Sequence, residues 1–316
     1  MKDIALRVLH LAVVLFGVSV ITFLLIRLLP GDPALSIAAT TGSVDQGTLD
    51  AIRHRLGLDL PLWQQYANWI VGIFHGDLGV SYRTSQPIST AILTNLPVTV
   101  QLVVMAQVLS LAVAIPVALW VAPRRDSWLD RIIAGITFVL QAVPNYVLAI
   151  FLVLIFAVGL HWLPAIGYVS LTDDVWGSIR SLLIPTLAVS ALLIAMYTRV
   201  LRSSMIETLQ MDFMLVGKAM GFSRGRLLWG AGLKPSLPSL VTVVGLNFGV
   251  LIGATVVVEV ICGIRGLGTL LWNAINTRDY LLVQGLVLVF AVAYVLANFV
   301  ADIIHLIIDP RVRAAK

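Results

Sequence analysis

The 316-residue sequence carries little charge: Asp, Glu, Lys and Arg make up only 12% of it, compared with roughly 25% in ordinary soluble domains. Hydrophobic residues make up 59%, and the mean hydropathy is +0.98. Because so few charges cannot cover the surface of a soluble protein, we expect an integral membrane protein. The net charge of +5 does not indicate a nucleic-acid-binding protein, since the basic residues lie in short patches between apolar runs.

Residues that carry enzyme chemistry are also scarce. The single cysteine, Cys262, excludes an internal disulfide bond and a thiolate metal cage. The five histidines are scattered, and none has a Glu or another His three or four residues further on, so no helical metal site is expected. There is no G-x-x-x-x-G-K-S/T phosphate loop and no G-x-S-x-G nucleophile motif. We therefore predict that this chain has no catalytic residue, no metal and no cofactor of its own.

Long uncharged apolar runs, in contrast, are frequent. A helix needs about 20 mostly apolar residues to cross the roughly 30 Å hydrocarbon core of a bilayer. Six segments meet this requirement: 8–26, 84–123 with its membrane part starting near Pro97, 132–160, 181–198, 235–258 and 280–301. They predict an all-α integral membrane protein with six transmembrane helices. The first run is too long for the apolar part of a signal peptide and no A-x-A site follows it, so we do not expect it to be cleaved.

The distribution of Lys and Arg predicts the orientation. These residues are more numerous at both ends of the chain, in the turn 123–131 and in the segment 199–236 than in the other connections. Cytoplasmic connections of membrane proteins carry such an excess. We therefore expect both termini in the cytoplasm, a large extracytoplasmic loop at about 30–96 and a second large loop in the cytoplasm. The chain then divides into an N-terminal helix with its loop, 1–96, and a five-helix core, 97–316.

The extracytoplasmic loop predicts two short amphipathic helices, the second starting at Pro61 and rich in aromatic residues that suit a membrane interface. One interpretation is that its apolar face only packs on the helix bundle. The other is that the loop forms a docking and lid element for an external partner. The candidates for such contacts are Trp63, Trp69, Gly76, Asp77 and Gly79.

The cytoplasmic segment 199–236 predicts a helix, a sharp turn and a second helix. Gly221 fits the end of the first helix, because glycine adopts the left-handed conformation without a Cβ penalty, and Ser223 fits the N-cap of the second. Apolar residues of the first helix share one face at helical spacing: Phe213, Val216, Gly217 and Met220. An apolar face on a short helix outside the membrane needs a cover. We favour a cytoplasmic partner over the protein's own bundle.

Motifs along most of the chain resemble those of the dipeptide/oligopeptide-type permease subunits of ABC importers, in the peptide/nickel permease family. They are LLPGDPA at 28–34, LGLDLPL at 56–62, QY at 65–66, GDLGVS at 76–81, NLPVT at 95–99, GLG at 266–268, RDY at 278–280, QG at 284–285 and DPRVR at 309–313. The cytoplasmic segment is similar to the EAA loop of that family, with DF at 212–213, GKAMGF at 217–222 and LP at 237–238. It departs from the family pattern because the Glu is absent and Met220 replaces a basic residue.

The resemblance implies a type I ABC importer permease fold in the bacterial cytoplasmic membrane, surrounded by lipid and with no role for nucleic acid. The chain would form half of a translocation pore with a second, homologous permease subunit. Two ATP-binding cassette ATPase subunits would supply the energy, with ATP and Mg bound to them, and an extracytoplasmic binding protein would deliver the substrate. The residues implied in coupling to the ATPase are Asp212, Phe213, Val216, Gly217, Lys218, Ala219, Met220 and Gly221.

The sequence leaves the cargo open. The resemblance favours dipeptides or oligopeptides, with nickel or glutathione-type molecules as alternatives, and a stand-alone ion-coupled secondary transporter is a further alternative. Polar residues within the expected spans could face the substrate pathway, because they are costly against lipid: Gln141, Asn145, Tyr197, Asn247 and Asn298. Hydrogen bonds between helices are the other role open to these residues.

Overall fold

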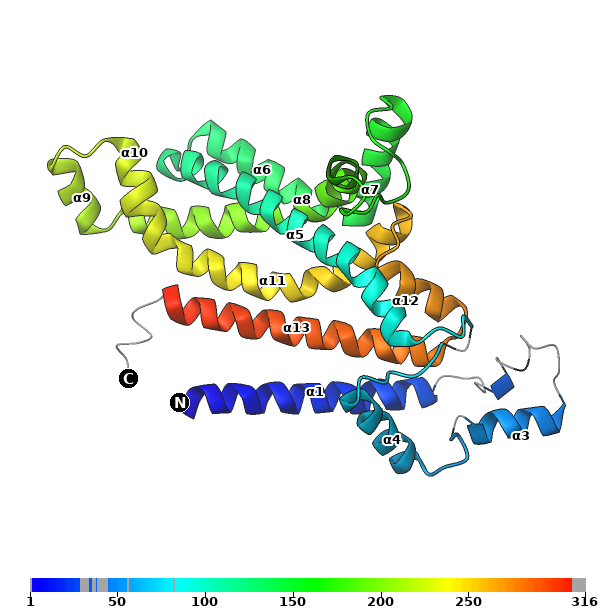
Figure 1. The fold of residues 1–316 in the computed structure, drawn as a ribbon. Helices are drawn as coiled ribbons and strands as arrows, with labels where there is room; N and C mark the ends of the chain where they lie inside the picture. The colour runs from blue at the N-terminus through cyan, green and yellow to red at the C-terminus, as the bar shows by residue number, and fades with distance from the viewer. Residues whose placement is uncertain are drawn as a thin grey trace. The chain divides into compact units, whose positions relative to one another are not determined.

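The computed structural model is helical over most of the residues that it describes, which are 2–28, 34, 35, 38, 45–55, 57–81 and 83–308 (Figure 1). Parts of the sequence motifs at 28–34, 56–62 and 309–313 lie outside the described residues. The chain forms two compact units, each described here by itself. Unit 1 comprises Met1–Thr99 and Arg265–Val295, and unit 2 comprises Val100–Ile264 and Leu296–Lys316.

Unit 1 combines the N-terminal helix, the predicted extracytoplasmic loop and two later helices. Its elements are α1 (Lys2–Leu28), α3 (Gln46–Arg55), α4 (Leu62–Phe74), the start of α5 (Ile88–Val121), α12 (Leu267–Asn276) and the start of α13 (Tyr280–Ile308). Buried residues from α5, α12 and α13 form one apolar core: Ile88, Ile92, Leu267, Ala274, Leu282 and Leu286. At Gly285 a Cβ atom would lie 2.9 Å from Ile88 Cγ2, so only glycine allows α13 to approach α5 this closely.

A buried hydrogen bond joins the end of the predicted extracytoplasmic loop to the start of α13. Ser81 Oγ donates to the Asp279 carboxylate at 2.5 Å, and both residues are buried. The same carboxylate accepts the Leu282 N–H at 3.3 Å, which satisfies one of the free amides of the first turn of α13. The loop and the start of α13 are therefore parts of one packed structure, although about 200 residues separate them in the sequence.

Unit 2 is built around the long helix α8 (Val175–Leu209), which packs against α6 (Trp128–Ala142), α7 (Asn145–Leu152) and α11 (Leu233–Ile261). Its shorter elements are η1 (Ala122–Arg124), η2 (Val153–Gly159), α9 (Asp212–Ala219), α10 (Arg224–Arg226) and η3 (Leu227–Gly232). Small residues allow close helix contacts here, as is usual in membranes. At Gly245 of α11, a Cβ atom would lie 2.0 Å from Ala301 Cβ of α13.

The described residues contain four helices that are long and apolar enough to cross a membrane: Ile88–Arg124, Val175–Leu209, Arg224–Ile261 and Tyr280–Ala301. A fifth span arises if the bent pair Trp128–Ala142 and Asn145–Gly159 counts as one. The predicted all-α membrane fold is confirmed. The remaining predicted span, 8–26, falls in α1. The described apolar part of this helix, Leu11–Leu24, is shorter than a membrane span requires, so the count of six spans stays a prediction.

The helix of the second predicted span, α5, begins at Ile88, because Ile88 and Ile92 are buried in the core of unit 1 and this packing extends the helix. The expected start of its membrane part near Pro97 stays a prediction. The third span was expected to be continuous, but it bends by 99° between α6 and α7. The break lies at Val143, whose extended ψ of 120° is the conformation favoured before a proline, here Pro144.

Candidate functional site

The turn after α9 has the geometry that its sequence predicts. Gly221 adopts a left-handed φ of +79°. The Phe222 N–H donates to the Gly217 carbonyl at 3.1 Å and the Gly221 N–H to the Lys218 carbonyl at 3.0 Å, which together form a Schellman motif. Ser223 caps α10 by accepting the Arg226 N–H at 3.4 Å. The predicted arrangement of helix, sharp turn and helix is confirmed, and α9 is held in a fixed direction relative to the chain that follows.

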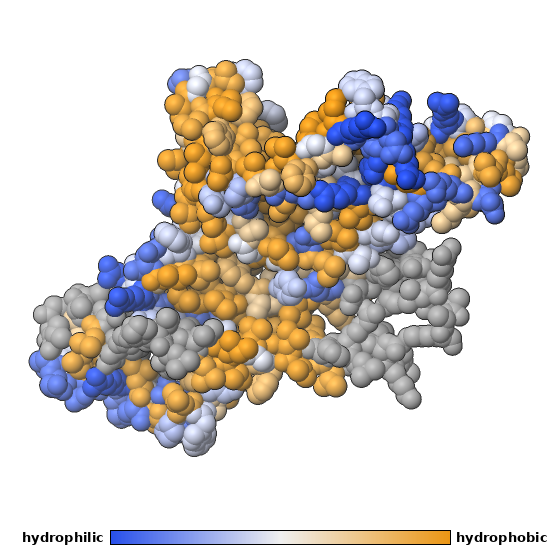
Figure 2. Space-filling model, turned by 180° about the vertical axis from the view of Figure 1, so that it is seen from behind, coloured by the Kyte–Doolittle hydropathy of each residue, from blue (hydrophilic) through white to orange (hydrophobic). Residues whose placement is uncertain are grey.

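The outer face of α9 carries large exposed apolar side chains. Phe213, Val216 and Met220 are 44%, 57% and 67% exposed. The sequence analysis placed Gly217 on this face as well, and this was wrong. Gly217 is buried, and a Cβ atom there would lie 2.7 Å from Leu227 Cδ2. The reason is that glycine lets η3 approach the inner side of α9. Figure 2 shows hydrophobic residues among hydrophilic ones at the end of the molecule that carries α9 and α10.

The inner side of α9 borders a cavity of about 330 Å³ within unit 2. Apolar residues from α8, α9 and η3 line much of it, among them Leu209, Met214 and Leu227. Its basic residues are Arg125, Lys218 and Arg224. Of the predicted coupling residues, Lys218 therefore lies beside this cavity, whereas Phe213, Val216 and Met220 lie on the exposed face.

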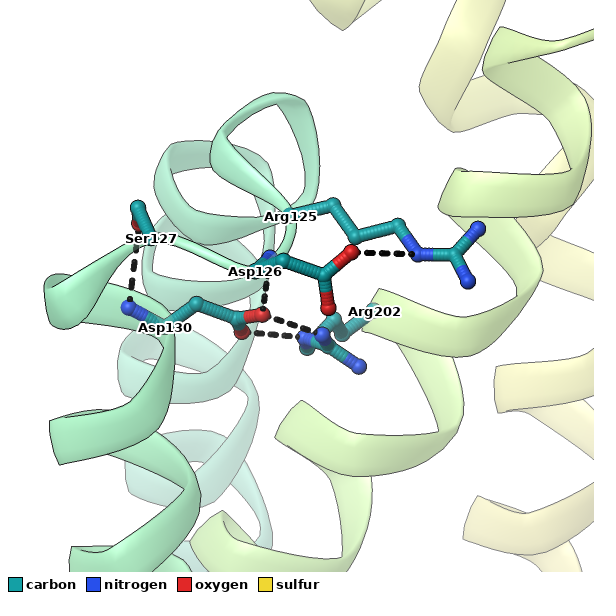
Figure 3. A network of polar contacts seen from close by, with 5 residues as sticks. All are labelled: Arg125, Asp126, Ser127, Asp130 and Arg202. Atoms are coloured by element: carbon teal, nitrogen blue, oxygen red, sulfur yellow. Dashed lines mark hydrogen bonds and ion pairs between the residues drawn. The ribbon is translucent and has the colours of Figure 1, made fainter.

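A buried ion pair lies close to this region and was not singled out from the sequence (Figure 3). Arg202 of α8 donates from Nε and Nη2 to the two carboxylate oxygens of Asp130 of α6, at 2.6 and 2.5 Å. The Asp130 side chain is only 6% exposed and that of Arg202 27%. The Asp126 N–H also donates to Asp130 at 3.0 Å, and Ser127 caps α6 by accepting the Asp130 N–H at 3.3 Å. This bidentate arrangement ties the α5–α6 turn to the end of α8 that leads into α9.

The extracytoplasmic candidates fall into two environments. Trp63 is 72% exposed and Gly76 forms a turn with φ +77°. Trp69 is half-buried and stacks on Phe23 of α1, with ring centroids 6.2 Å apart. Asp77 and Gly79 form the next turn, in which Asp77 Oδ1 accepts the Gly79 N–H at 2.8 Å.

Three of these five residues, Trp69, Asp77 and Gly79, line one cavity of about 220 Å³ within unit 1. Trp63 and Gly76 do not line it. The structure therefore brings three of the five candidates together and leaves two at the surface.

None of the five predicted pathway residues is among the described residues that line either of the two cavities above. Tyr197 is completely buried, and its hydroxyl accepts a hydrogen bond from Gln107 Nε2 at 3.0 Å, so it joins α8 to α5 inside unit 2. Asn145 donates to the Ala254 carbonyl of α11 at 3.1 Å, and Asn247 donates to the Val243 carbonyl at 2.8 Å. Gln141 and Asn298 are half-buried. For Tyr197 and Asn145 these contacts fit the alternative role, hydrogen bonding between helices; facing the pathway stays a prediction for all five.

Two sequence families match the chain and together cover most of it. Residues 114–314 match the family described as binding-protein-dependent transport system inner membrane component. Residues 1–103 match the N-terminal part of such membrane components. The chain belongs to this family. The resemblance of the sequence motifs to those of the dipeptide/oligopeptide-type permease subunits of ABC importers is confirmed.

Similar proteins of this family match along almost their whole length. The chain is 39% identical over 307 residues to a putative peptide transport system permease protein of Brucella abortus (strain 2308), covering 97% of both chains. It is 35% identical over 327 residues to the dipeptide transport system permease protein DppB of Alkalihalophilus pseudofirmus, covering 97% of this chain and 98% of the other. It is 34% identical over 316 residues to the glutathione transport system permease protein GsiC of Shigella flexneri serotype 5b, with 97% of both covered.

The fold also matches a solved structure. A chain of the inward-facing MetNI methionine ABC transporter superposes with a TM-score of 0.55 at 18% identity, covering 72% of this chain and 100% of that one. At this identity the likeness concerns the fold alone. The predicted fold, that of an ABC importer permease, is confirmed, and the family is one of membrane permease subunits.

Proposed function

We propose that the chain is one half of the translocation pore of an ATP-driven importer of peptides. Its partners are a second, homologous permease subunit, two ATPase subunits that bind ATP and Mg, and an extracytoplasmic binding protein that delivers the cargo. Membership of a binding-protein-dependent transport family supports this assembly. The names of the relatives at 39% and 35% identity favour peptides as cargo, and the relative at 34% identity makes a glutathione-type molecule the second candidate.

The observation that carries the coupling role is the exposed apolar face of α9. The helix lies between two spans, Val175–Leu209 and Arg224–Ile261, and is therefore outside the apolar segments. Phe213 and Val216 of α9, with Met220 directly after its last residue, suit an apolar groove on a partner, the way amphipathic helices are commonly bound. Such a contiguous exposed patch is costly in water and marks an interaction site.

The connections of α9 suit the transmission of movement. Only two residues, 210–211, separate α9 from α8, and the Schellman turn and η3 join it to α11. Packing of Gly217 against Leu227 leaves little room between α9 and η3. When ATP closes the ATPase pair, α9 would move as a rigid lever and carry α8 and α11 between inward-open and outward-open arrangements of the pore.

Purification tests the assembly directly. A tagged copy of the chain, extracted from its native membrane in mild detergent, should bring down a second permease of this family and two P-loop ATPase chains, identified by mass spectrometry. The chain reconstituted alone under an ion gradient should be inert. Recovery of the chain alone or as a homo-oligomer, together with gradient-driven uptake, would instead establish the stand-alone carrier.

Cysteine labelling tests the proposed orientation, with both termini and α9 in the cytoplasm. The natural Cys262 is only 3% exposed and burial raises the pKa of its thiol to about 11, so it should react negligibly with maleimides. In intact cells, a membrane-impermeant maleimide should label Trp63→Cys, whereas Val216→Cys should be labelled only after lysis. The reverse pattern would invert the topology.

A further inference from the structure

The cavity of about 330 Å³ on the inner side of α9 is apolar inside and basic at its edge. Its buried apolar lining residues are Ala122, Met214 and Leu227. Its basic lining residues, all of them exposed, are Arg125, Lys218 and Arg224. The described residues that line the cavity include no Asp or Glu. The cavity therefore combines a hydrophobic floor with positive charge around its opening.

Most of this positive charge has no counter-charge within unit 2. Arg125 Nε lies 3.4 Å from the Asp126 carboxylate, whereas the side chains of the other two basic residues form no ion pair with any residue that the structure describes. The acids of the neighbouring helices, Glu207 of α8 and Asp212 of α9, do not line the cavity. Charge complementarity therefore favours an anionic occupant.

The cavity lies where three apolar spans end. Its lining residues come from the last turns of the spans Ile88–Arg124 and Val175–Leu209, from the first turns of the span Arg224–Ile261, and from α9 between them. The ends of apolar spans lie at the depth of the lipid headgroups. Basic pockets between helices at this depth attract anionic headgroups. The location thus adds a lipid to the charge requirement.

We propose that this cavity binds the headgroup of an anionic phospholipid of the cytoplasmic leaflet. The phosphate group lies among Arg125, Lys218 and Arg224, and the first carbons of the acyl chains pack on Met214 and Leu227. A free phosphate ion would leave the apolar floor in contact with water, so an amphiphile fits better. The volume of about 330 Å³ lies within the range of about 300–1,000 Å³ typical of ligand pockets. Only the choice of leaflet rests on the proposed orientation.

The test is a lipid-binding measurement on the purified full-length chain together with the subunits that accompany it. Native mass spectrometry in detergent follows titration with phosphatidylglycerol and, separately, with phosphatidylcholine that has the same acyl chains. We expect phosphatidylglycerol to bind at least tenfold more tightly, because only this lipid has a net negative charge. Glycerol 3-phosphate, which has the phosphate group but no acyl chains, should bind at least tenfold more weakly than phosphatidylglycerol.

A pair of double variants assigns the binding to this cavity. Arg125→Gln with Arg224→Gln should weaken phosphatidylglycerol binding at least tenfold and bring it within threefold of phosphatidylcholine binding. Both arginines are exposed, so the size-exclusion profile should stay that of the wild type. The matched control is Arg131→Gln with Arg226→Gln, which removes two exposed charges nearby that do not line the cavity. This control should bind phosphatidylglycerol like the wild type.

Three results would overturn the proposal. Equal binding of the two lipids by the wild type would mean that the cavity does not select an anionic headgroup. Equal binding by the two double variants would mean that any preference arises from general charge near the membrane surface. Glycerol 3-phosphate binding as tight as that of phosphatidylglycerol would make the cavity a site for soluble phosphate esters. None of these results affects the proposed importer, which is tested separately by the ATPases that co-purify with the chain.

Discussion

Val216→Glu abolishes ATP-driven uptake while membrane insertion and folding stay intact; this is the result expected if α9 docks in an ATPase groove. Val216 is 57% exposed in the chain by itself, so a carboxylate there remains in water until the partner binds. Docking would then bury an unpaired charge in an apolar groove. For a central interface residue the loss is about 2 kcal/mol or more, which weakens binding about 30-fold. Binding-protein-dependent uptake into proteoliposomes, measured beside ATP hydrolysis, gives the result.

Leu215→Glu is the matched control for this variant. Leu215 is 60% exposed, similar to Val216, but lies about 100° or more around the helix from the three residues of the outer face. The same change of charge and size should therefore leave uptake within about threefold of the wild-type value. Normal uptake by Val216→Glu, or equal loss in both variants, would contradict docking through this face.

The parts of the fold that depend on neighbouring residues could be predicted from the sequence. Gly221 and Ser223 mark the turn after α9 because glycine permits a positive φ and serine caps a helix, and both properties act within a few residues. The apolar spans could be located because bilayer thickness fixes the length of an apolar helix. The break at Val143 was equally local, since Pro144 disfavours a helical residue before it, but the long apolar run concealed this signal.

The features that depend on distant residues could not be predicted. Asp130 and Arg202 are 72 residues apart, and Ser81 and Asp279 are 198 residues apart. A single sequence shows that such polar residues are present but not which of them come together. The start of α5 at Ile88 depends on distant residues in the same way, because Ile88 and Ile92 pack in the core of unit 1.

The second large effect is expected at the ion pair between α6 and α8. Asp130→Ala leaves the Arg202 guanidinium without its carboxylate in a largely buried position, and Arg202→Ala leaves the more deeply buried Asp130 carboxylate without its cation. Breaking a buried pair from one side costs about 3 kcal/mol or more, which corresponds to a fall in the thermal midpoint of about 4–5 °C or more for a chain of 316 residues. To measure the midpoint, samples are heated to a series of temperatures and then run on a size-exclusion column. The midpoint is the temperature at which half of the monodisperse peak is lost.

A neighbouring pair provides the control for this prediction. Arg125 and Asp126 lie in the same turn at 3.4 Å, but their side chains are 56% and 79% exposed, and a surface pair contributes only about 0–1 kcal/mol. Arg125→Ala should therefore change the midpoint by about 2 °C or less. A similar small change in Asp130→Ala would show that the buried pair does not hold the α5–α6 turn on α8.

The double variant Asp130→Leu with Arg202→Met distinguishes a need for these charges from a need for a filled contact. Replacing both partners of a buried pair with apolar residues often restores stability, so the midpoint should return most of the way to the wild-type value. Exchanging the charges, Asp130→Arg with Arg202→Asp, should restore much less. The Asp126 N–H and the first turn of α6 both favour an anion at position 130, and an arginine there meets only donors. Full recovery in the exchanged variant would mean that attraction between the two side chains, and not the local geometry of the turn, is what matters at this position.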